Sequence, residues 1–269
     1  MGNKKERIDK LLVDRCFFET REKARAAIMC GIVYVDEQRI DKPGQNVSIS
    51  SNIIIKSNTM PYVSRGGLKL KKAIDSFDIT VKGKIALDVG ASTGGFTHCL
   101  LEHGAKKVYA VDVGYGQLSW KLRNDSRVVC MERTNVRHLA PRQIPDVIDI
   151  VTIDASFISL KLIIEPIKLI LKYNGEIVCL VKPQFEAGRE KVGKKGVIKD
   201  VITHTEVLEN MIDYVLKSGL TVLGITYSPI KGAEGNIEYL LYLKKDFSDL
   251  NVADFKIIIE EVVKESHEM

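Results

Sequence analysis

The chain has 269 residues, of which 45% are hydrophobic and 28% are charged, as in an ordinary globular protein with one large domain or with one medium and one small domain. The most apolar window, residues 158–172, carries Lys161, Glu165 and Lys168 and is too short and too charged to span a bilayer, so we expect no membrane partner. The five cysteines show neither a CxxC pair nor metal-ligand spacing, and no secretory signal opens the chain. We therefore expect no metal and a reducing, cytoplasmic location.

Positive charge is concentrated in the N-terminal third. Residues 1–84 contain 17 lysines and arginines against 10 aspartates and glutamates, whereas the remaining residues contain 23 against 25. A basic segment beside a neutral remainder favours an anionic partner, most often nucleic acid. A solvated charged face would give the same counts, so charge alone leaves both readings open.

The first third of the sequence predicts a small α+β domain over residues 1–58. Thr20 is a suitable N-cap for its second helix, and Gly31 is a suitable end. A polar, proline-containing segment, residues 59–64, then predicts a linker to a second domain over residues 65–269. The expected elements of the first domain are helices over residues 6–16 and 20–31, a hairpin over 32–40, a turn over 42–47 and a strand over 52–56.

From residue 84 onward, apolar strands alternate with helical stretches. This alternation predicts a parallel sheet covered on both faces by helices. No helix separates the last two strands, so we expect an antiparallel hairpin at one edge, and residues 252–269 predict a C-terminal amphipathic helix. The strands are expected over residues 84–89, 107–112, 127–131, 148–154, 176–182, 220–227 and 237–243.

A glycine-rich turn, "GASTGG" (residues 90–95), follows the first of these strands. In a doubly wound sheet, ligands bind beside this turn. No lysine follows the last glycine, which excludes a phosphate-binding P-loop. Ser92 stands where a dinucleotide-binding turn needs a glycine. The remaining candidate is a ligand that lies against the backbone but brings no phosphate.

Two aspartates at strand ends narrow the choice of ligand. Asp112 ends the second strand, and its carboxylate can accept hydrogen bonds from both ribose hydroxyls of a nucleoside. Asp88 ends the first strand and could meet a cationic amino group. S-adenosylmethionine, a nucleoside that carries an amino acid, fits both positions. The alternative is an ordinary strand-to-helix turn without a ligand.

Four charged residues occupy unusual positions and are candidates for catalysis. Asp154 and Lys182 end the fourth and fifth strands, Glu238 lies in an apolar strand, and Lys69 precedes the sheet. Each residue alone would more often form a structural ion pair. Taken together at strand ends, the four favour catalysis, because a buried charge is costly without a partner or a role.

These residue types also limit the reaction. The fourth strand is not followed by the Asn/Asp-Pro-Pro-aromatic turn of many N-methyltransferases, and Cys179 lies in mid-strand, where it cannot form an adduct. Lysines flanked by carboxylates suit an alcohol. Deprotonating a ribose 2′-hydroxyl at neutral pH costs on the order of 8 kcal/mol. Ammonium groups could stabilise the developing alkoxide, or Lys182 could accept the proton as a base, and the residues leave both open.

The motifs of the chain are similar to those of the TlyA (hemolysin A) family of FtsJ-like ribosomal RNA 2′-O-methyltransferases, over nearly the whole length. They are "SRGGLKL", "LDVGASTGGFT", "DVGYGQL", "LRND", "ERTN", "SFISL", "VKPQFE" and "GNIEY". The resemblance implies a Rossmann-like class I S-adenosylmethionine-dependent methyltransferase fold with a mostly parallel seven-stranded sheet. It also implies a catalytic set, which falls on Lys69, Asp154, Lys182 and Glu238.

The resemblance further implies the residues that bind cofactor and RNA. The cofactor-binding residues implied are Asp88, Gly90, Ala91, Ser92, Gly94, Gly95, Phe96, Asp112, Val113, Arg133 and Asn135. The N-terminal domain is expected to share the RNA-binding fold of a small-subunit ribosomal protein. Its expected RNA contacts, with one residue from the segment that follows, are Arg7, Arg21, Lys23, Arg25 and Arg65.

The implied activity is 2′-O-methylation of cytidine in ribosomal RNA, in 23S rRNA and, given the C-terminal helix, also in 16S rRNA. We expect the protein to be a monomer in isolation and to act on ribosomal subunits. Two alternatives are a non-catalytic rRNA-binding assembly factor with a vestigial pocket and a membrane-active haemolysin. The four charged residues argue against the first, and the lack of an apolar span argues against the second.

Overall fold

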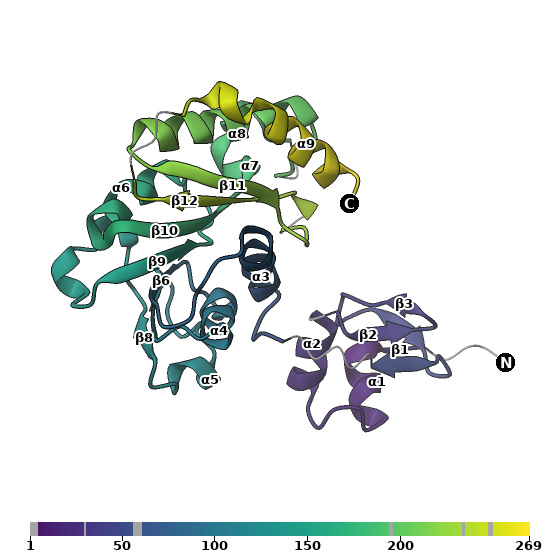
Figure 1. Cartoon of the computed structure of the whole chain (residues 1–269). Coiled ribbons are helices and arrows are strands. Elements are labelled where there is room, and N and C mark those ends of the chain that lie inside the picture. Colours follow the sequence, from purple (N-terminus) through teal and green to yellow (C-terminus); the bar gives the residue numbers. More distant parts are fainter. Residues whose placement is uncertain (1–4, 30, 56–60, 194–195, 233–234, 247–249) are drawn as a thin grey trace. The chain divides into compact units, whose positions relative to one another are not determined.

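The computed structural model describes residues 5–29, 31–55, 61–193, 196–232, 235–246 and 250–269. The chain divides into two compact units, residues 1–65 and residues 66–269 (Figure 1). The expected domain bounds, 1–58 and 65–269 with a linker over 59–64, stay a prediction, and residues 59–60 of that linker lie outside the described residues.

The first unit packs two helices against small antiparallel sheets. One sheet has the strand order β3-β2-β5, and the other pairs β1 with β4. Both helices and the larger sheet contribute side chains to one core, among them Ile8, Leu12, Ile28 and Val33. The elements are β1 (Lys5–Arg7), α1 (Ile8–Asp14), α2 (Arg21–Met29), β2 (Val33–Val35), β3 (Gln38–Arg39), β4 (Asn46–Ser48) and β5 (Ile53–Ile55).

Both helices and the hairpin of this unit confirm the expectation, but the pairing of β1 with β4 differs from it. The sequence pattern extends the first helix back over β1 and places a turn over most of β4. Each of these strands has three residues, and only Val47 among the six is buried. No alternation of apolar and polar residues therefore marks this non-local pair.

The second unit is built on a sheet that, within the described residues, has seven strands in the order β11-β12-β10-β9-β6-β7-β8. The pairs from β10 to β8 are parallel, and β12 runs antiparallel to both β10 and β11. The predicted parallel sheet with an antiparallel edge hairpin is thus confirmed. The strands are β6 (Ile85–Val89), β7 (Lys107–Val111), β8 (Val128–Met131), β9 (Ile148–Ile153), β10 (Leu171–Val181), β11 (Thr221–Tyr227) and β12 (Tyr239–Lys244).

Helices cover both faces of this sheet, as predicted (Figure 1). Side chains of α6, α8 and α9 share one large core with alternate residues of the strands, such as Leu87 and Val151. Helices α3 and α4 pack on the opposite face. The helices are α3 (Gly66–Phe77), α4 (Gly95–Glu102), α5 (Trp120–Arg123), α6 (Lys161–Ile170), α7 (Pro183–Glu186), α8 (Val201–Lys217) and α9 (Lys256–His267), with 3₁₀ turns η1 (Val136–His138), η2 (Pro141–Gln143), η3 (Arg189–Lys191) and η5 (Val252–Phe255).

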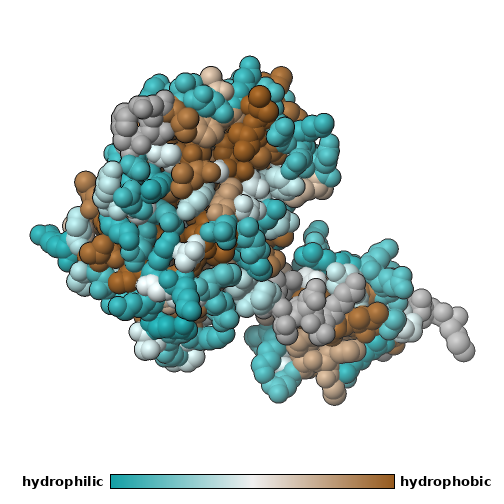
Figure 2. All heavy atoms as spheres, viewed as in Figure 1, coloured by the Kyte–Doolittle hydropathy of each residue, from teal (hydrophilic) through white to brown (hydrophobic). Residues whose placement is uncertain are grey.

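The predicted C-terminal helix is present as η5 and α9. The buried side chains of α9 include Ile259, Val262 and Val263, which join the main core. Figure 2 shows further hydrophobic residues along α9 and beside β11, where Leu223 and Ile257 are exposed. Among the described helices, none is long and apolar enough to cross a membrane.

The parallel strands decide where the site lies. Because β6, β7, β9 and β10 run in the same direction, their carboxyl ends meet at one edge of the sheet. The residues that directly follow these strands are Gly90, Asp112, Asp154 and Lys182. The fold therefore gathers the glycine turn and three of the candidate charged groups at this edge.

Candidate active site

Four charged side chains form one row of contacts beside the ends of β9 and β10. Lys182 Nζ lies 2.7 Å from Asp154 Oδ1. Lys69 Nζ lies 3.9 Å from Asp154 Oδ2 and 2.6 Å from Glu238 Oε2. The structure thus brings together the four predicted catalytic residues in the order Lys182, Asp154, Lys69 and Glu238. We call this row the charged tetrad. Positive and negative charges alternate along it.

Burial makes the pairing within the tetrad necessary. Lys69 and Lys182 are each 7% exposed and Glu238 is 3% exposed, whereas the side chain of Asp154 is 21% exposed. Removing the partner of a buried charge costs about 3–5 kcal/mol. Because its side chain is the most exposed of the four, Asp154 is the member that an entering substrate can reach most directly.

Each tetrad residue arrives from a different element. Asp154 follows β9, Lys182 follows the adjacent parallel strand β10, and Lys69 projects from α3. Glu238 stands just before β12 and not inside a strand as predicted, because pairing begins at Tyr239. A Cβ atom on Gly232 would collide with Glu238 Oε1, so the glycine leaves room for this carboxylate.

The hydroxyl group of Ser156 makes a further contact at the Lys182 end of the tetrad. Lys182 Nζ donates a hydrogen bond to Ser156 Oγ at 2.8 Å. Ser156 lies two residues after Asp154, in the loop that follows β9. The ammonium group of Lys182 is therefore held by two groups of one loop, which fixes the direction of its remaining N–H bond.

A cavity of about 550 Å³ opens beside the tetrad at the ends of β6, β7 and β9. This volume falls in the ~300–1,000 Å³ range of small-molecule sites. Asp154 lines the cavity, as do five of the predicted cofactor residues, which are Gly90, Ser92, Asp112, Val113 and Asn135. The tetrad and the cavity thus share Asp154.

Two backbone N–H groups orient the Asp112 carboxylate so that it can bind a ligand in this cavity. Its Oδ2 accepts a hydrogen bond from Ser92 N, and its Oδ1 accepts one from Gly114 N, both at 2.7 Å. Each carboxylate oxygen keeps a further lone pair for a hydroxyl donor. A nucleoside diol fits this pair of acceptors, and no cationic group clamps the carboxylate among the contacts described for it.

Two glycines of the turn have positions that a side chain would disturb. Gly90 has φ +81°, and a Cβ atom there would lie 2.5 Å from the backbone oxygen of Asp154. Gly94 has φ +94°, and its Cβ would collide with Leu122 Cδ1. Gly90 therefore allows the turn to touch the β9 end, and Gly94 allows α5 to approach α4.

Six of the predicted cofactor residues do not line the cavity. They are Asp88, Ala91, Gly94, Gly95, Phe96 and Arg133. Asp88 is fully buried, and its oxygens accept hydrogen bonds from Thr97 Oγ1 at 2.6 Å and Thr152 Oγ1 at 2.9 Å. The carboxylate is thus held between α4 and β9, and its expected contact with a ligand's amino group stays a prediction. The Arg133 guanidinium instead stacks 4.0 Å from the centre of the Tyr115 ring.

Several lining residues were not identified from the sequence pattern. They are Val89, Val111, Gln117, Thr134, Val136, Arg137, Ala155, Ser156, Phe157, Ile158 and Ile163. Most lie in loops or 3₁₀ turns, where no periodic pattern marks the side that faces a ligand. Phe157 gives one local signal, since it is a bulky aromatic residue with φ +63° and is 91% exposed.

Glu132 shapes the loop that borders the cavity. Its Oε1 accepts hydrogen bonds from Gln117 N at 2.9 Å and Leu118 N at 3.3 Å, and it pairs with Arg123 at 2.7 Å. These contacts lower the pKa of Glu132 to about 2, chiefly through the Arg123 hydrogen bond. A carboxylate of the "ERTN" motif thus supports the cavity from outside.

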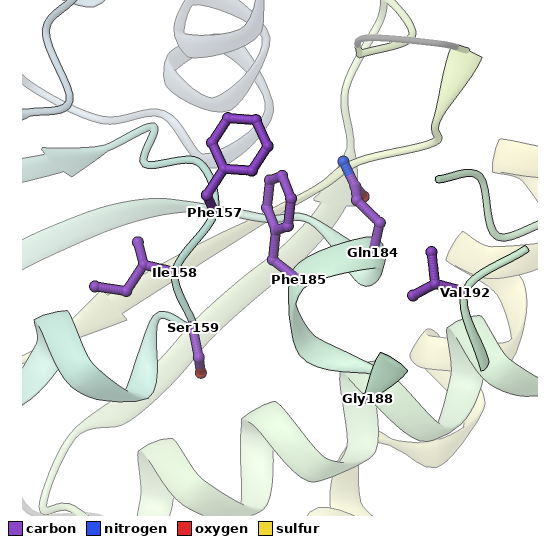
Figure 3. Close-up of a pocket in the computed structure, with 7 residues that line it drawn as sticks. All are labelled: Phe157, Ile158, Ser159, Gln184, Phe185, Gly188 and Val192. Atoms are coloured by element: carbon purple, nitrogen blue, oxygen red, sulfur yellow. The ribbon is translucent and has the colours of Figure 1, made fainter. Parts of the chain in front are cut away.

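A second cavity of about 570 Å³ shares Phe157 and Ile158 with the first (Figure 3). Phe185 lies beside Phe157, with 5.1 Å between the ring centres. The loop that carries both Ser156 and Phe157 is anchored by Glu186, which accepts hydrogen bonds from Ser159 Oγ and Leu160 N at 2.7 and 2.8 Å.

A doubly wound sheet with an inserted antiparallel strand, and a cavity beside its first glycine turn, defines a Rossmann-like fold with a small-molecule site at its strand ends. Comparison with known proteins agrees. The FtsJ-like methyltransferase family model matches residues 62–245, and the S4 domain model matches residues 6–53. The chain belongs to the FtsJ-like methyltransferase family and carries an S4 domain.

Individual relatives resemble the chain over most of its length. It is 53% identical to "Putative rRNA methyltransferase YqxC" of Bacillus subtilis, over 90% of this chain and 87% of that protein. It is 41% identical to "16S/23S rRNA (cytidine-2′-O)-methyltransferase TlyA" of Mycobacterium tuberculosis, over 90% of each. The solved structure "Putative hemolysin from Streptococcus thermophilus" matches with a TM-score of 0.79 and 44% identity, over 99% of this chain and 97% of that chain.

These findings confirm the resemblance to the TlyA (hemolysin A) family, the fold class and the enzyme class. They also confirm S-adenosylmethionine as the cofactor. The cavity fits this group, because its volume suits a small ligand and the Asp112 carboxylate faces it with free acceptor capacity.

Replacing Asp112 by asparagine should weaken the binding of S-adenosylmethionine at least about tenfold. The asparagine amide keeps one acceptor and turns a donor toward Ser92 N or Gly114 N, and a hydrogen bond to a charged group is worth ~1.5–3 kcal/mol. Calorimetric titration measures the affinity. Asp125→Asn is the control, since Asp125 pairs with Arg127 and does not line the cavity. Unchanged affinity in Asp112→Asn would contradict the assignment.

Burial raises the pKa of Asp88 to about 6. Since this folded-state pKa lies above the ordinary value of 3.8, ionisation destabilises the fold; the penalty is absent below about pH 4 and complete above about pH 6. Asp88→Asn should therefore gain stability relative to wild type, by ~2–3 kcal/mol, as pH rises from 4 to 7. Urea unfolding across this range measures the difference.

Thr97→Val removes one of the two hydroxyl donors to Asp88. The variant should lose more stability than wild type above pH 6, because the ionised carboxylate then keeps only the Thr152 hydroxyl and the backbone N–H of residue 97. A stability difference between Asp88→Asn and wild type that stays constant with pH would show that Asp88 does not titrate in this range.

Proposed function

We propose that this enzyme methylates the 2′-hydroxyl of a cytidine in ribosomal RNA. The observation that carries the proposal is the charged tetrad, whose Asp154 also lines the cofactor cavity. Ribose hydroxyls are poor nucleophiles at neutral pH, and a site with two ammonium groups at a reacting oxygen suits them. The relative from Mycobacterium tuberculosis is named for this reaction on 16S and 23S rRNA.

The chain's own groups would lower the cost of activating the hydroxyl. S-adenosylmethionine supplies an electrophilic methyl group when it is bound. Lys182 and Lys69 are held on opposite oxygens of Asp154, at 2.7 and 3.9 Å. A hydroxyl seated at Asp154 would release its proton to solvent by way of this carboxylate, which costs ~8 kcal/mol at neutral pH. The two nearby positive charges would offset part of that cost by stabilising the alkoxide.

Glu238 would keep Lys69 in place during the reaction. It pairs with Lys69 at 2.6 Å and is almost fully buried. Without this carboxylate, Lys69 would move toward Asp154 and compete with Lys182 for it. Glu238 is therefore a positioning residue, whereas Lys69, Asp154 and Lys182 would face the reacting oxygen.

The aromatic side chain beside the tetrad supports an RNA substrate. Phe157 is 91% exposed and lies between the two cavities that share it. Exposed aromatic rings stack on unpaired bases in proteins that recognise single-stranded RNA. The left-handed backbone of Phe157 is costly, and such outliers persist mainly at functional sites.

The first unit would supply affinity for the RNA backbone. Arg7 and Arg21 both pair with the buried Asp9, at 2.9 and 2.8 Å, and each arginine side chain remains about half exposed. This shared carboxylate holds two positive charges side by side, and its own pKa lies far below the usual range chiefly because Arg7 donates to it. Lys23, Arg25 and Arg65 are also exposed.

The remaining expectations follow from this activity. We infer that residues 1–58 bind rRNA, that residues 59–64 connect them to the catalytic domain 65–269, and that the enzyme works in the cytoplasm on ribosomal subunits. We infer a monomer, because one chain supplies both the tetrad and the cavity. Ala91, Gly94, Gly95, Phe96 and Arg133 would support the cofactor site from outside the cavity.

Replacing Lys182 by alanine should lower methyl transfer at least ~100-fold, because the positive charge at the developing oxyanion is lost. Transfer of labelled methyl groups to ribosomal subunits from cells that lack this gene measures the rate. Cofactor affinity should stay within about twofold, since Lys182 does not line the cavity. Lys172→Ala, which removes a surface ion pair with Asp149, is the matched control. Wild-type transfer by Lys182→Ala would disprove the catalytic assignment.

Replacing Arg21 by alanine should weaken binding to ribosomal subunits several-fold. The slope of log affinity against log salt concentration should fall in magnitude by about one, as expected for the loss of one phosphate contact. Filter binding at several salt concentrations measures both quantities. Lys217→Ala, which removes an exposed cation of α8, is the control. If the slope of log affinity against log salt concentration is unchanged in Arg21→Ala, Arg21 does not contact an RNA phosphate.

A further inference from the structure

The ammonium group of Lys182 has one N–H donor left for a substrate. It carries three N–H donors, and within the described residues its Nζ contacts two acceptors, Asp154 Oδ1 at 2.7 Å and Ser156 Oγ at 2.8 Å. Lys182 is only 7% exposed, so the third donor has little access to water. A nearly buried ammonium with one open donor suits an oxygen that the substrate brings.

The two partners of Lys182 differ in charge. Asp154 is a carboxylate that also faces Lys69, at 3.9 Å, whereas Ser156 is a neutral hydroxyl. Lys69, in contrast, lies between the carboxylates of Asp154 and Glu238. A hydroxyl directs an N–H bond of Lys182 without neutralising the ammonium, so this positive charge stays available to a developing oxyanion.

The loop that carries Ser156 is tied to the segment that follows Lys182. Further along this loop, Ser159 Oγ and Leu160 N donate hydrogen bonds to Glu186 at 2.7 and 2.8 Å. Glu186 ends α7, which begins directly after Lys182. Contacts that need no bound ligand therefore hold Ser156 next to the lysine, as a pre-organised site requires.

We propose that Ser156 is a positioning residue for methyl transfer, whose hydroxyl holds the Lys182 ammonium so that the open N–H group points to the reacting ribose oxygen. This inference rests on the proposed methylation of a ribose hydroxyl and adds the group that orients its lysine. Ser156 itself exchanges no atom or proton in the transfer.

Ser156→Ala should lower kcat at least about fivefold, because Lys182 then keeps one acceptor and its open N–H group is no longer directed. The KM for ribosomal subunits and the affinity for S-adenosylmethionine should stay within about twofold. Transfer of labelled methyl groups to subunits from cells that lack this gene measures the rate, and calorimetric titration measures the affinity. Ser218→Ala, which removes a hydroxyl bonded to Val215 O outside both cavities, is the control.

A conservative variant separates the hydroxyl from the shape of the loop. Ser156→Thr keeps the hydroxyl, and the side chain at this position is exposed, so an added methyl group has room. It should restore kcat to within about twofold of the wild type. Because Ser156 also lines the cofactor cavity, a loss of cofactor affinity in Ser156→Ala as large as its loss of kcat would make it a cofactor ligand instead and overturn the inference.

A double variant tests whether Ser156 acts through Lys182. In Lys182→Ala the hydroxyl has no ammonium to hold, so adding Ser156→Ala should change the remaining rate by less than about twofold. A further fivefold loss in the double variant, or a kcat of Ser156→Ala equal to that of wild type, would overturn the inference. A wild-type enzyme that transfers no methyl group to ribosomal RNA would instead overturn the proposed function.

Discussion

The contacts of one carboxylate, Asp154, hold the catalytic region together. Its two oxygens face Lys182 and Lys69, which would otherwise place two buried positive charges close to each other. Glu238 neutralises the second lysine, so the four groups carry no net charge. Since Asp154 also lines the cofactor cavity, the pairing that makes burial possible also fixes where a substrate hydroxyl can meet a methyl group.

The backbone around Asp154 is also held in place by close packing and hydrogen bonds. The glycine turn touches its backbone oxygen, where only the missing Cβ of Gly90 allows the approach. Asp154 N donates to Val89 O at 2.9 Å. Below the turn, Asp88 accepts from Thr152, two residues before Asp154. Packed and hydrogen-bonded in this way, the turn and the end of β9 form one rigid support for both the cofactor cavity and the tetrad.

The sequence indicates which residues reach the site better than it indicates which way they point. Asp112, Asp154 and Lys182 were expected at strand ends, and the structure places each directly after a parallel strand, where such ends meet at one edge. The rule does not bring Asp88 to the cavity, because this residue lies one position earlier in β6, and its carboxylate accepts hydrogen bonds from Thr97 of α4 and Thr152 of β9.

Loop residues were the least predictable part. Ser156 and Phe157 belong to a motif that supported the resemblance, but nothing in their spacing shows that one contacts Lys182 and the other separates two cavities. Arg133 was expected at the cofactor; its backbone is left-handed, and its guanidinium stacks on the Tyr115 ring. Long-range features of this kind depend on where loops fold back, which no local period records.

The free-energy cost of burying the charged tetrad is evidence for a catalytic role. Replacing a buried ionic cluster with apolar residues of similar volume is often neutral or stabilising by ~1–4 kcal/mol. A protein that only bound rRNA would need neither two nearly buried lysines nor a glycine that makes room for Glu238. The same argument covers Phe157, whose exposed ring and strained backbone contribute little to packing. Groups that are unfavourable for folding and converge beside one cavity are explained more simply by chemistry on a bound nucleotide than by assembly alone.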